Sequence, residues 1–195
     1  PGAALLAEAV ADQLGSEAII SRTSRLVVDL NRSLRHPQLF SEFTRSLSPQ
    51  ARQKLLEKFY IPYRARVEAA VRAGIQQTGR AIHLSMHSFT PVLDGIERNA
   101  EVGLLYDPRR SPERILSQRL KASILKSHPS YRVRFNYPYL GTADGHTSWL
   151  RKRFPEAMYV GIEIEISQAL IDADWAARAK RLAAAIRESL HPQTR

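Results

Sequence analysis

Residues 161–167 read Gly-Ile-Glu-Ile-Glu-Ile-Ser, and this stretch decides the fold. Successive side chains of a strand point to opposite faces, so the three isoleucines share one face while Glu163 and Glu165 share the other. We therefore predict a strand over residues 158–166. The apolar residues that follow recur at helical spacing, and they predict a helix over residues 168–190.

Helical and strand-like patterns alternate along the rest of the chain. They predict further helices over residues 3–14, 48–78 with a kink at Pro62, 111–127 and 147–154. They predict further strands over residues 18–20, 25–30, 81–86, 101–106 and 131–136. The sequence contains no internal repeat or linker. We therefore predict a single α/β domain over residues 1–195, with a mixed, mostly parallel sheet flanked by helices.

The composition narrows the class of protein. The 195 residues are 44% hydrophobic and 25% charged, as in a globular protein, and no apolar run is long enough to span a membrane. The absence of cysteine excludes disulfides, thiolate metal sites and a thiol nucleophile, and is compatible with the cytoplasmic location that we expect. The net charge of +10 favours anionic partners, among them carboxylate substrates, nucleic acid and membrane surfaces, although a solvated basic surface would explain it equally well. We expect no membrane partner.

The segment from Arg25 to Arg32 offers the first group of candidate site residues. It presents Asn31 and Arg32 at the end of a predicted strand, where an amide beside a guanidinium suits the binding of a carboxylate. The alternative is a surface arginine paired with Asp29.

Strand alternation places His83, Ser85 and His87 on one side of their strand. A histidine where a strand ends suits a metal ligand or a general base, so we single out His87, the alternative being a hydrogen-bonded structural histidine. The two histidines lie roughly 13 Å apart along a strand and would not share one ion.

Glu163 and Glu165 would be buried if their strand were central. Such carboxylates must be paired, bound to metal, or raised in pKa to serve as a general base. The alternative is an edge strand with one solvated face.

The loop over residues 136–141, Asn-Tyr-Pro-Tyr-Leu-Gly, adds an amide and two phenols. Aromatic packing in a proline turn is the alternative explanation for its composition. Nucleotide-binding glycine loops, the serine-hydrolase elbow and the helical zinc-protease pattern do not occur in the sequence.

Four segments together resemble the N-formylglutamate amidohydrolase family in content and order. They are SRLVVDLNR at 24–32, HSFTP at 87–91, NYPYLG at 136–141 with Asp144 and Gly145, and GIEIEIS at 161–167. The resemblance implies hydrolysis of the formyl amide of N-formyl-L-glutamate, or of a similar small acidic N-acyl amino acid. It also implies a phosphorylase/hydrolase-like fold similar to zinc carboxypeptidases, with zinc as the cofactor.

The resemblance also implies residue roles. Asn31 and Arg32 would bind the substrate carboxylate, His87 would be a zinc ligand, and Glu165 would activate water. Glu165 is preferred to Glu163 because the family pattern ends in Glu-Ile-Asn, which Glu165, Ile166 and Ser167 match with serine in place of asparagine. Three further substrate-binding residues are expected: Arg25, Asn136 and Tyr139.

One segment of the family pattern has no counterpart here, namely the early metal-binding loop with a histidine beside an acidic residue. We expect it to precede Pro1, so zinc is expected only where those upstream ligands are present. Two alternatives remain open: an amidase or carboxypeptidase acting on another acidic peptide, and a non-catalytic basic protein that binds nucleic acid. Nucleic acid is the less favoured partner, and the sequence leaves the oligomeric state open.

Overall fold

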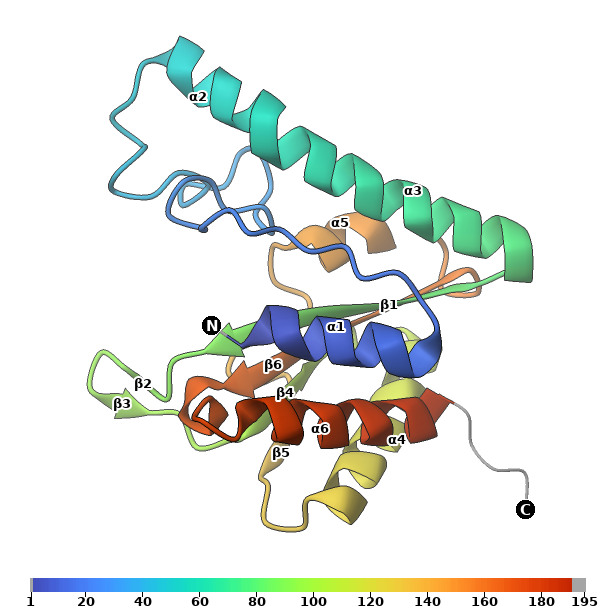
Figure 1. The fold of residues 1–195 in the computed structure, drawn as a ribbon. Coiled ribbons are helices and arrows are strands. Elements are labelled where there is room, and N and C mark those ends of the chain that lie inside the picture. The colour runs from blue at the N-terminus through green and yellow to red at the C-terminus, as the bar shows by residue number, and fades with distance from the viewer. Residues whose placement is uncertain (1, 191–195) are drawn as a thin grey trace. The chain divides into compact units, whose positions relative to one another are not determined.

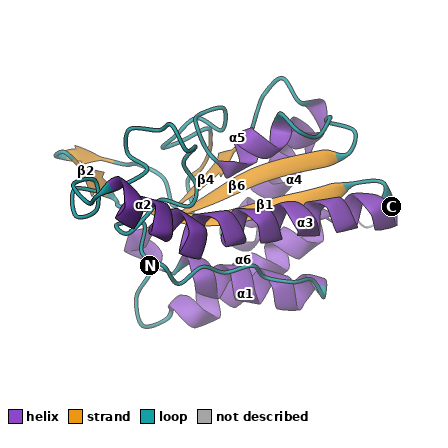
Figure 2. Cartoon of the chain, turned by 90° about the horizontal axis from the view of Figure 1, so that it is seen from above, coloured by secondary structure: helices purple, strands orange, loops and turns teal. Residues whose placement is uncertain are grey.

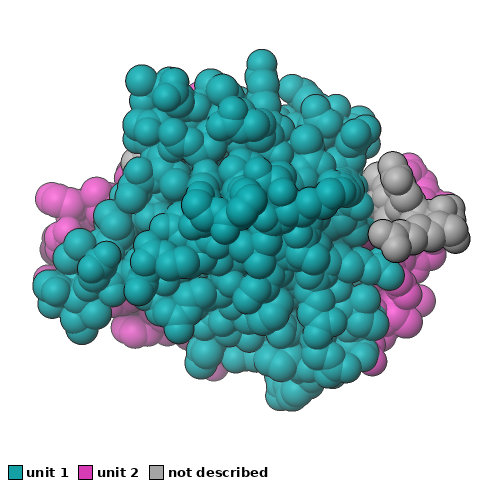
Figure 3. All heavy atoms as spheres, turned by 90° about the horizontal axis from the view of Figure 1, so that it is seen from below, with its two compact units in different colours: residues 1–18, 83–142, 160–195 teal, residues 19–82, 143–159 magenta. Residues whose placement is uncertain are grey.

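The computed structural model describes residues 2–190, so Pro1 and residues 191–195 lie outside the description. Contacts between Cα atoms divide the chain into two compact units (Figure 3). Unit 1 comprises residues 1–18, 83–142 and 160–195, and unit 2 comprises residues 19–82 and 143–159. The single domain over residues 1–195 stays a prediction, and each unit is described by itself.

The main sheet has four strands in the order β1-β6-β4-β5 (Figure 1). These are β1 (Ala81–Phe89), β4 (Val102–Leu105), β5 (Val133–Phe135) and β6 (Tyr159–Ser167). Strand β4 runs parallel to β5 and antiparallel to β6. The predicted α/β class with a mixed sheet is confirmed. Every residue of β6 is buried and both of its neighbours are strands, so the edge-strand alternative is wrong.

Helices α1 (Ala3–Leu14), α4 (Ser111–Ser127) and α6 (Trp175–Leu190) pack with the sheet of unit 1 in one core. This core takes up Ile162, Ile164 and Ile166, which are at most 1% exposed. Full burial of each isoleucine contributes roughly 1.5–3 kcal/mol to the free energy of folding. The isoleucines therefore hold β6 in a register that turns Glu163 and Glu165 to the opposite face, as the alternation predicts.

Unit 1 also contains a hairpin that we did not predict, formed by β2 (Val92–Leu93) and β3 (Ile96–Glu97). Its two-residue turn is Asp94-Gly95, and both residues have left-handed backbones, with φ of 52° and 76°. Such a turn matches the twist of two antiparallel strands. The Asp-Gly pair is a sequence signal for such a hairpin turn. The two strands could not be predicted, because each has only two residues and shows no alternation of apolar and polar side chains.

Unit 2 is built on a long helix that runs through α2 (Pro49–Leu55), the π-helical turn η1 (Leu56–Tyr60) and α3 (Ile61–Thr78) (Figure 2). Ser48 caps its start by accepting a hydrogen bond from the amide of Ala51 at 3.2 Å. Gly79 ends it with φ of 78°. A wider π-helical turn lies just before Pro62, which has no N–H to donate, and the kink at Pro62 stays a prediction.

The remaining helix of unit 2 is α5 (His146–Arg151). It packs through Leu150 against Val67 and Val71 of α3, in a core that Phe154 and Tyr159 complete. Within residues 2–190, the structure contains no helix with the length and apolar character needed to cross a membrane.

Three predictions about secondary structure are wrong. Residues 18–20 and 25–30 form no strand, and the second segment folds into turns instead. Side chains satisfy its backbone there: Ser41 Oγ donates to the carbonyl of Leu26, and Thr44 Oγ1 to that of Val27. The predicted closing helix is interrupted between η2 (Gln168–Leu170) and α6, where the carboxylate of Asp172 accepts from the amide of Asp174 and forms a local turn.

Candidate functional site

His87 and Glu163 meet on the face of the sheet opposite the core of unit 1. Nε2 of His87 lies 3.6 Å from Oε2 of Glu163 and 2.9 Å from Oγ of Ser85. Leu84 and Met86 pack on the core side of β1, so Ser85 and His87 share the other side, as strand alternation predicts. His87 lies within β1 and not beyond its end, because the strand extends to Phe89.

The two carboxylates on this face are both buried, with Glu163 7% and Glu165 6% exposed. They are two residues apart on one strand, roughly 6.6 Å. The structure pairs His87 with Glu163, and the role of Glu165 in activating water stays a prediction. Buried carboxylates need polar partners, and His87 supplies one to Glu163.

Gly103 allows the loop after β5 to approach the same face. Gly103 pairs with Glu165 across β4 and β6, and a Cβ at Gly103 would collide with the carbonyl of Tyr137 and lie 3.3 Å from Cβ of Glu165. Tyr137 therefore lies over the sheet next to Glu165. This close approach brings the predicted loop, residues 136–141, to the face that carries the carboxylates.

Asn136 holds this loop in shape. Its side-chain Oδ1 accepts hydrogen bonds from the amides of Tyr106 at 3.1 Å and Gly141 at 2.9 Å, and its own backbone is left-handed with φ of 48°. Contact of Asn136 with a substrate stays a prediction, but its observed contacts order the loop.

Tyr139 is 42% exposed on the same loop. Its hydroxyl accepts a hydrogen bond from Arg98 Nη1 at 3.0 Å, and the guanidinium carbon of Arg98 lies 5.0 Å from the centre of its ring. Its predicted contact with a substrate is untested. Sequence reasoning missed Arg98, which belongs to the unpredicted hairpin region.

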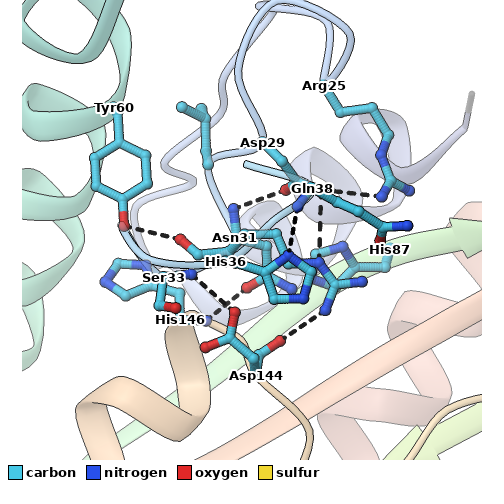
Figure 4. Close-up of polar contacts among 12 residues, drawn as sticks. Arg25, Asp29, Asn31, Ser33, His36, Gln38, Tyr60, His87, Asp144 and His146 are labelled. Carbon is cyan, nitrogen blue, oxygen red and sulfur yellow. Dashed lines mark hydrogen bonds and ion pairs between the residues drawn. The ribbon is translucent and has the colours of Figure 1, made fainter. Parts of the chain in front are cut away.

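In unit 2, Asp29 organises the segment that contains Asn31 and Arg32 (Figure 4). Its Oδ1 accepts from the amide of Asn31 at 3.0 Å, and its Oδ2 pairs with Arg25 Nη2 at 2.9 Å. The alternative reading of a surface arginine paired with Asp29 therefore describes Arg25, whose side chain is 71% exposed. Binding of substrate by Arg25 stays a prediction.

Asn31 and Arg32 contact the start of α5. Oδ1 of Asn31 accepts from the amide of His146 at 2.7 Å. Arg32 Nη1 donates to the carbonyl of Asp144 at 3.0 Å. The Asp144 carboxylate accepts from the amide of Ser33 at 2.9 Å (Figure 4). Asn31, Arg32 and Asp144, which belong to segments that resemble the family pattern, thus lie close together. The Arg32 side chain is 26% exposed.

Two side chains of the long helix donate hydrogen bonds to the backbone carbonyl of Arg32. The hydroxyl of Tyr60 donates to the carbonyl of Arg32 at 2.8 Å, and Arg64 Nη1 donates to the carbonyls of Leu30 at 3.1 Å and Arg32 at 3.4 Å. Arg64 is only 6% exposed and lies over the rings of Tyr60 and Trp149. Sequence reasoning missed both residues, because they lie about thirty positions away.

Burial shifts the pKa values of these two groups in opposite directions. Desolvation lowers the pKa of the Arg64 guanidinium, opposed by its favourable interactions with Tyr60, Asp144 and Tyr63. Desolvation raises the pKa of the Tyr60 phenol, and the positive charge of Arg64 opposes that shift. Tyr60 therefore stays protonated at neutral pH and keeps its hydroxyl as a donor to Arg32.

The zinc implied by the resemblance is not matched by a complete ligand set in the described part of the chain. Among residues 2–190, no group of three or more His, Asp or Glu side chains is arranged to hold a metal ion. A catalytic zinc site has three protein ligands, so the pair of His87 and Glu163 does not fit one by itself. The zinc ligand role of His87 stays a prediction.

Comparison with known proteins supports the sequence resemblance. The chain is similar to gene product Atu2144 from Agrobacterium tumefaciens, with 29% identity, a TM-score of 0.75, and coverage of 97% of this chain and 77% of the other. It is also similar in fold to the N-formylglutamate amidohydrolase from Ralstonia eutropha JMP134, with 20% identity, a TM-score of 0.73, and coverage of 95% and 79%. No curated protein matches the chain.

The family model FGase, N-formylglutamate amidohydrolase, matches residues 1–172. This range includes all four segments on which the resemblance was based, from SRLVVDLNR to GIEIEIS. The match and the fold agree with each other. The chain belongs to the N-formylglutamate amidohydrolase family, whose activity is the hydrolysis of amide C–N bonds.

Proposed function

We propose that this amidohydrolase cleaves the formyl amide of N-formyl-L-glutamate or of a closely similar N-acyl amino acid. The observation that carries the proposal is the pairing of His87 with Glu163 beside a second buried carboxylate, Glu165, on one face of β6. Amide hydrolysis needs a base to activate water and an acid to protonate the departing nitrogen. A buried carboxylate next to a fixed imidazole suits that requirement.

Glu165 is the proposed base. Glu163 is engaged with His87 at 3.6 Å, so its charge serves to orient the imidazole. Glu165 takes a proton from the attacking water, whose oxygen bonds to the formyl carbon. When the C–N bond breaks, the same proton passes to the nitrogen, and the products are formate and the free amino acid. We assign no step to zinc, because the described residues do not complete its site.

Arg32 is the proposed carboxylate-binding residue of unit 2. Its side chain is partly exposed, and its guanidinium is held by the hydrogen bond to the carbonyl of Asp144. A guanidinium presents several N–H donors in one plane and binds a carboxylate through two parallel hydrogen bonds. The net charge of +10 also favours acidic substrates.

The test is an assay of the purified protein with N-formyl-L-glutamate, with and without added Zn²⁺, in which formate and glutamate are both quantified. We expect equal amounts of the two products. The Glu165→Gln variant should fold normally and release about 10²- to 10⁴-fold less product per unit time. Absence of formate from every N-formyl amino acid tried would overturn the proposal, and N-acetyl-L-glutamate would measure the tolerance for a larger acyl group.

A further inference from the structure

Arg98 differs in its pairing from three arginines of unit 1. Arg109, Arg132 and Arg178 each pair with a carboxylate, at 2.7, 2.7 and 3.0 Å. Arg98 contacts no carboxylate among residues 2–190, and its guanidinium is held instead by the hydroxyl and the ring of Tyr139. A phenol carries no charge at neutral pH, so this contact leaves the positive charge of Arg98 uncompensated.

The contacts of Arg98 fix its direction without using most of its donors. A guanidinium has five N–H donors, and the Tyr139 hydroxyl accepts from one of them. The ring of Tyr139 holds the planar group from one side at 5.0 Å. The remaining N–H donors of Arg98 can therefore bind an anion directly. An arginine that is paired with a carboxylate would first have to break that ion pair.

The loop that holds Arg98 lies on the face of the sheet with the carboxylates. Tyr137 lies over Gly103, the residue opposite Glu165, and its hydroxyl accepts from the amide of Asn99 at 2.9 Å. This hydrogen bond ties the residue after Arg98 to the same loop. Arg98 and Tyr139 are therefore attached to the segment that lies over Gly103, the residue paired with the proposed base.

We propose that Arg98 is a specificity-determining residue that binds the side-chain carboxylate of a dicarboxylate substrate. The proposal rests on the proposed function and deepens it. N-formyl-L-glutamate has two carboxylates, and its side-chain carboxylate requires a cation of its own. Arg98 supplies an unpaired guanidinium that Tyr139 has already oriented, so a substrate with a neutral side chain would lose this interaction.

The test compares N-formyl-L-glutamate with N-formyl-L-glutamine, which has nearly the same shape but lacks the side-chain charge. Affinities for both are measured by calorimetry in the Glu165→Gln background, in which the ligands stay intact, and kcat/KM is measured in the active protein. We expect the unmodified Arg98 protein to prefer N-formyl-L-glutamate by about 10- to 100-fold, the range of a charge-assisted hydrogen bond. Arg98→Gln should reduce that ratio to nearly 1, and Tyr139→Phe should reduce it in part.

Arg134→Gln is the matched control. Arg134 lies in β5, next to that loop, with its guanidinium carbon 4.2 Å from the centre of the Tyr137 ring. This variant therefore removes one positive charge beside the loop and should leave the ratio unchanged. Equal loss of affinity for both ligands in Arg98→Gln, or an equal change of the ratio in Arg134→Gln, would overturn the proposal. Failure of the proposed function has a different outcome, namely no hydrolysis of either compound. If neither ligand binds the Glu165→Gln protein, the assignment of Arg98 is wrong as well.

Discussion

Nε2 of His87 and Oε2 of Glu163 lie 3.6 Å apart on neighbouring strands of the main sheet. This contact makes the two glutamates of β6 chemically different, although both are buried and both share one face. Glu163 lies beside the imidazole of His87. Glu165, two residues further, is the one that the proposed reaction uses as a base.

The first prediction separates these two carboxylates. Glu163→Gln keeps the shape and one acceptor oxygen, so we expect it to lower kcat by about 10-fold, whereas a general base contributes about 10²- to 10⁴-fold. Steady-state kinetics with N-formyl-L-glutamate would measure both variants, with circular dichroism to establish that each is folded. A greater loss in Glu163→Gln than in Glu165→Gln would mean that the two roles are exchanged.

The second prediction concerns Arg32. Its side chain makes one hydrogen bond, to the carbonyl of Asp144, and approaches Asp29 only to 4.0 Å. Arg32→Ala should therefore lower kcat/KM on an acidic substrate by an amount equivalent to about 2–4 kcal/mol, chiefly through KM, while thermal stability changes little. Arg72→Ala is the matched control, because Arg72 belongs to the same unit and pairs with a carboxylate, Glu68, but its side chain is 53% exposed. Retained kcat/KM with a much lower melting temperature would show that Arg32 is structural.

The third prediction concerns the support of Arg32 by the long helix. Tyr60→Phe removes only the hydroxyl that donates to the Arg32 carbonyl, and we expect a loss of about 1 kcal/mol in the free energy of unfolding. Arg64→Met should cost more, about 1–3 kcal/mol, because the carbonyls of Leu30 and Arg32 both lose a buried donor.

Urea denaturation and KM would be measured for both variants. We expect the variant with the larger loss of stability, Arg64→Met, also to have the larger increase in KM. We expect kcat to stay nearly constant in both, because these residues position Arg32 without contacting the reacting amide. A change in kcat with constant KM would contradict a positioning role.

The sequence was sufficient where one local pattern decides the structure. The alternation in residues 161–167 predicted both the strand and the faces of its side chains, because a buried strand requires apolar residues on the core side. The same reasoning failed for residues 25–30. Their apolar side chains are also buried in part, but hydroxyls from residues 41 and 44 take the place of a neighbouring strand. Those contacts come from outside the segment and leave no local pattern.

The candidate site was predictable in its residue types but not in its partners. Alternation placed Glu163 and Glu165 on one face, yet the choice of the one beside His87 depends on the register between strands far apart in the sequence. Nothing in the sequence distinguishes Tyr60 and Arg64 from other helix residues, and only the fold brings them to the Arg32 carbonyl. Arg98 was overlooked for the same reason, because its partner Tyr139 is 41 residues away.

The fourth prediction concerns Glu113, which fixes the start of β6. Its side chain is fully buried in the first turn of α4, where Oε2 accepts from the amide of Asp107 at 2.9 Å and Oε1 from the amide of Gly161 at 3.2 Å. Arg110 pairs with the same carboxylate at 3.2 Å. Glu113 therefore connects α4 to the strand that carries the proposed base.

Glu113→Ala would leave the Arg110 charge and two backbone donors without this acceptor, and we expect it to lower the free energy of unfolding by about 3–5 kcal/mol. Glu113→Gln replaces one carboxylate oxygen by an NH₂ group, which would face a hydrogen-bond donor. This variant should also lower the free energy of unfolding, but by less than Glu113→Ala. Glu188→Gln is the control, since its exposed pair with Lys126 should contribute little. The midpoints of urea denaturation would rank the three variants. Equal midpoints for Glu113→Ala and Glu188→Gln would show that the buried carboxylate does not hold β6, because its loss would then cost no more than the loss of a surface ion pair.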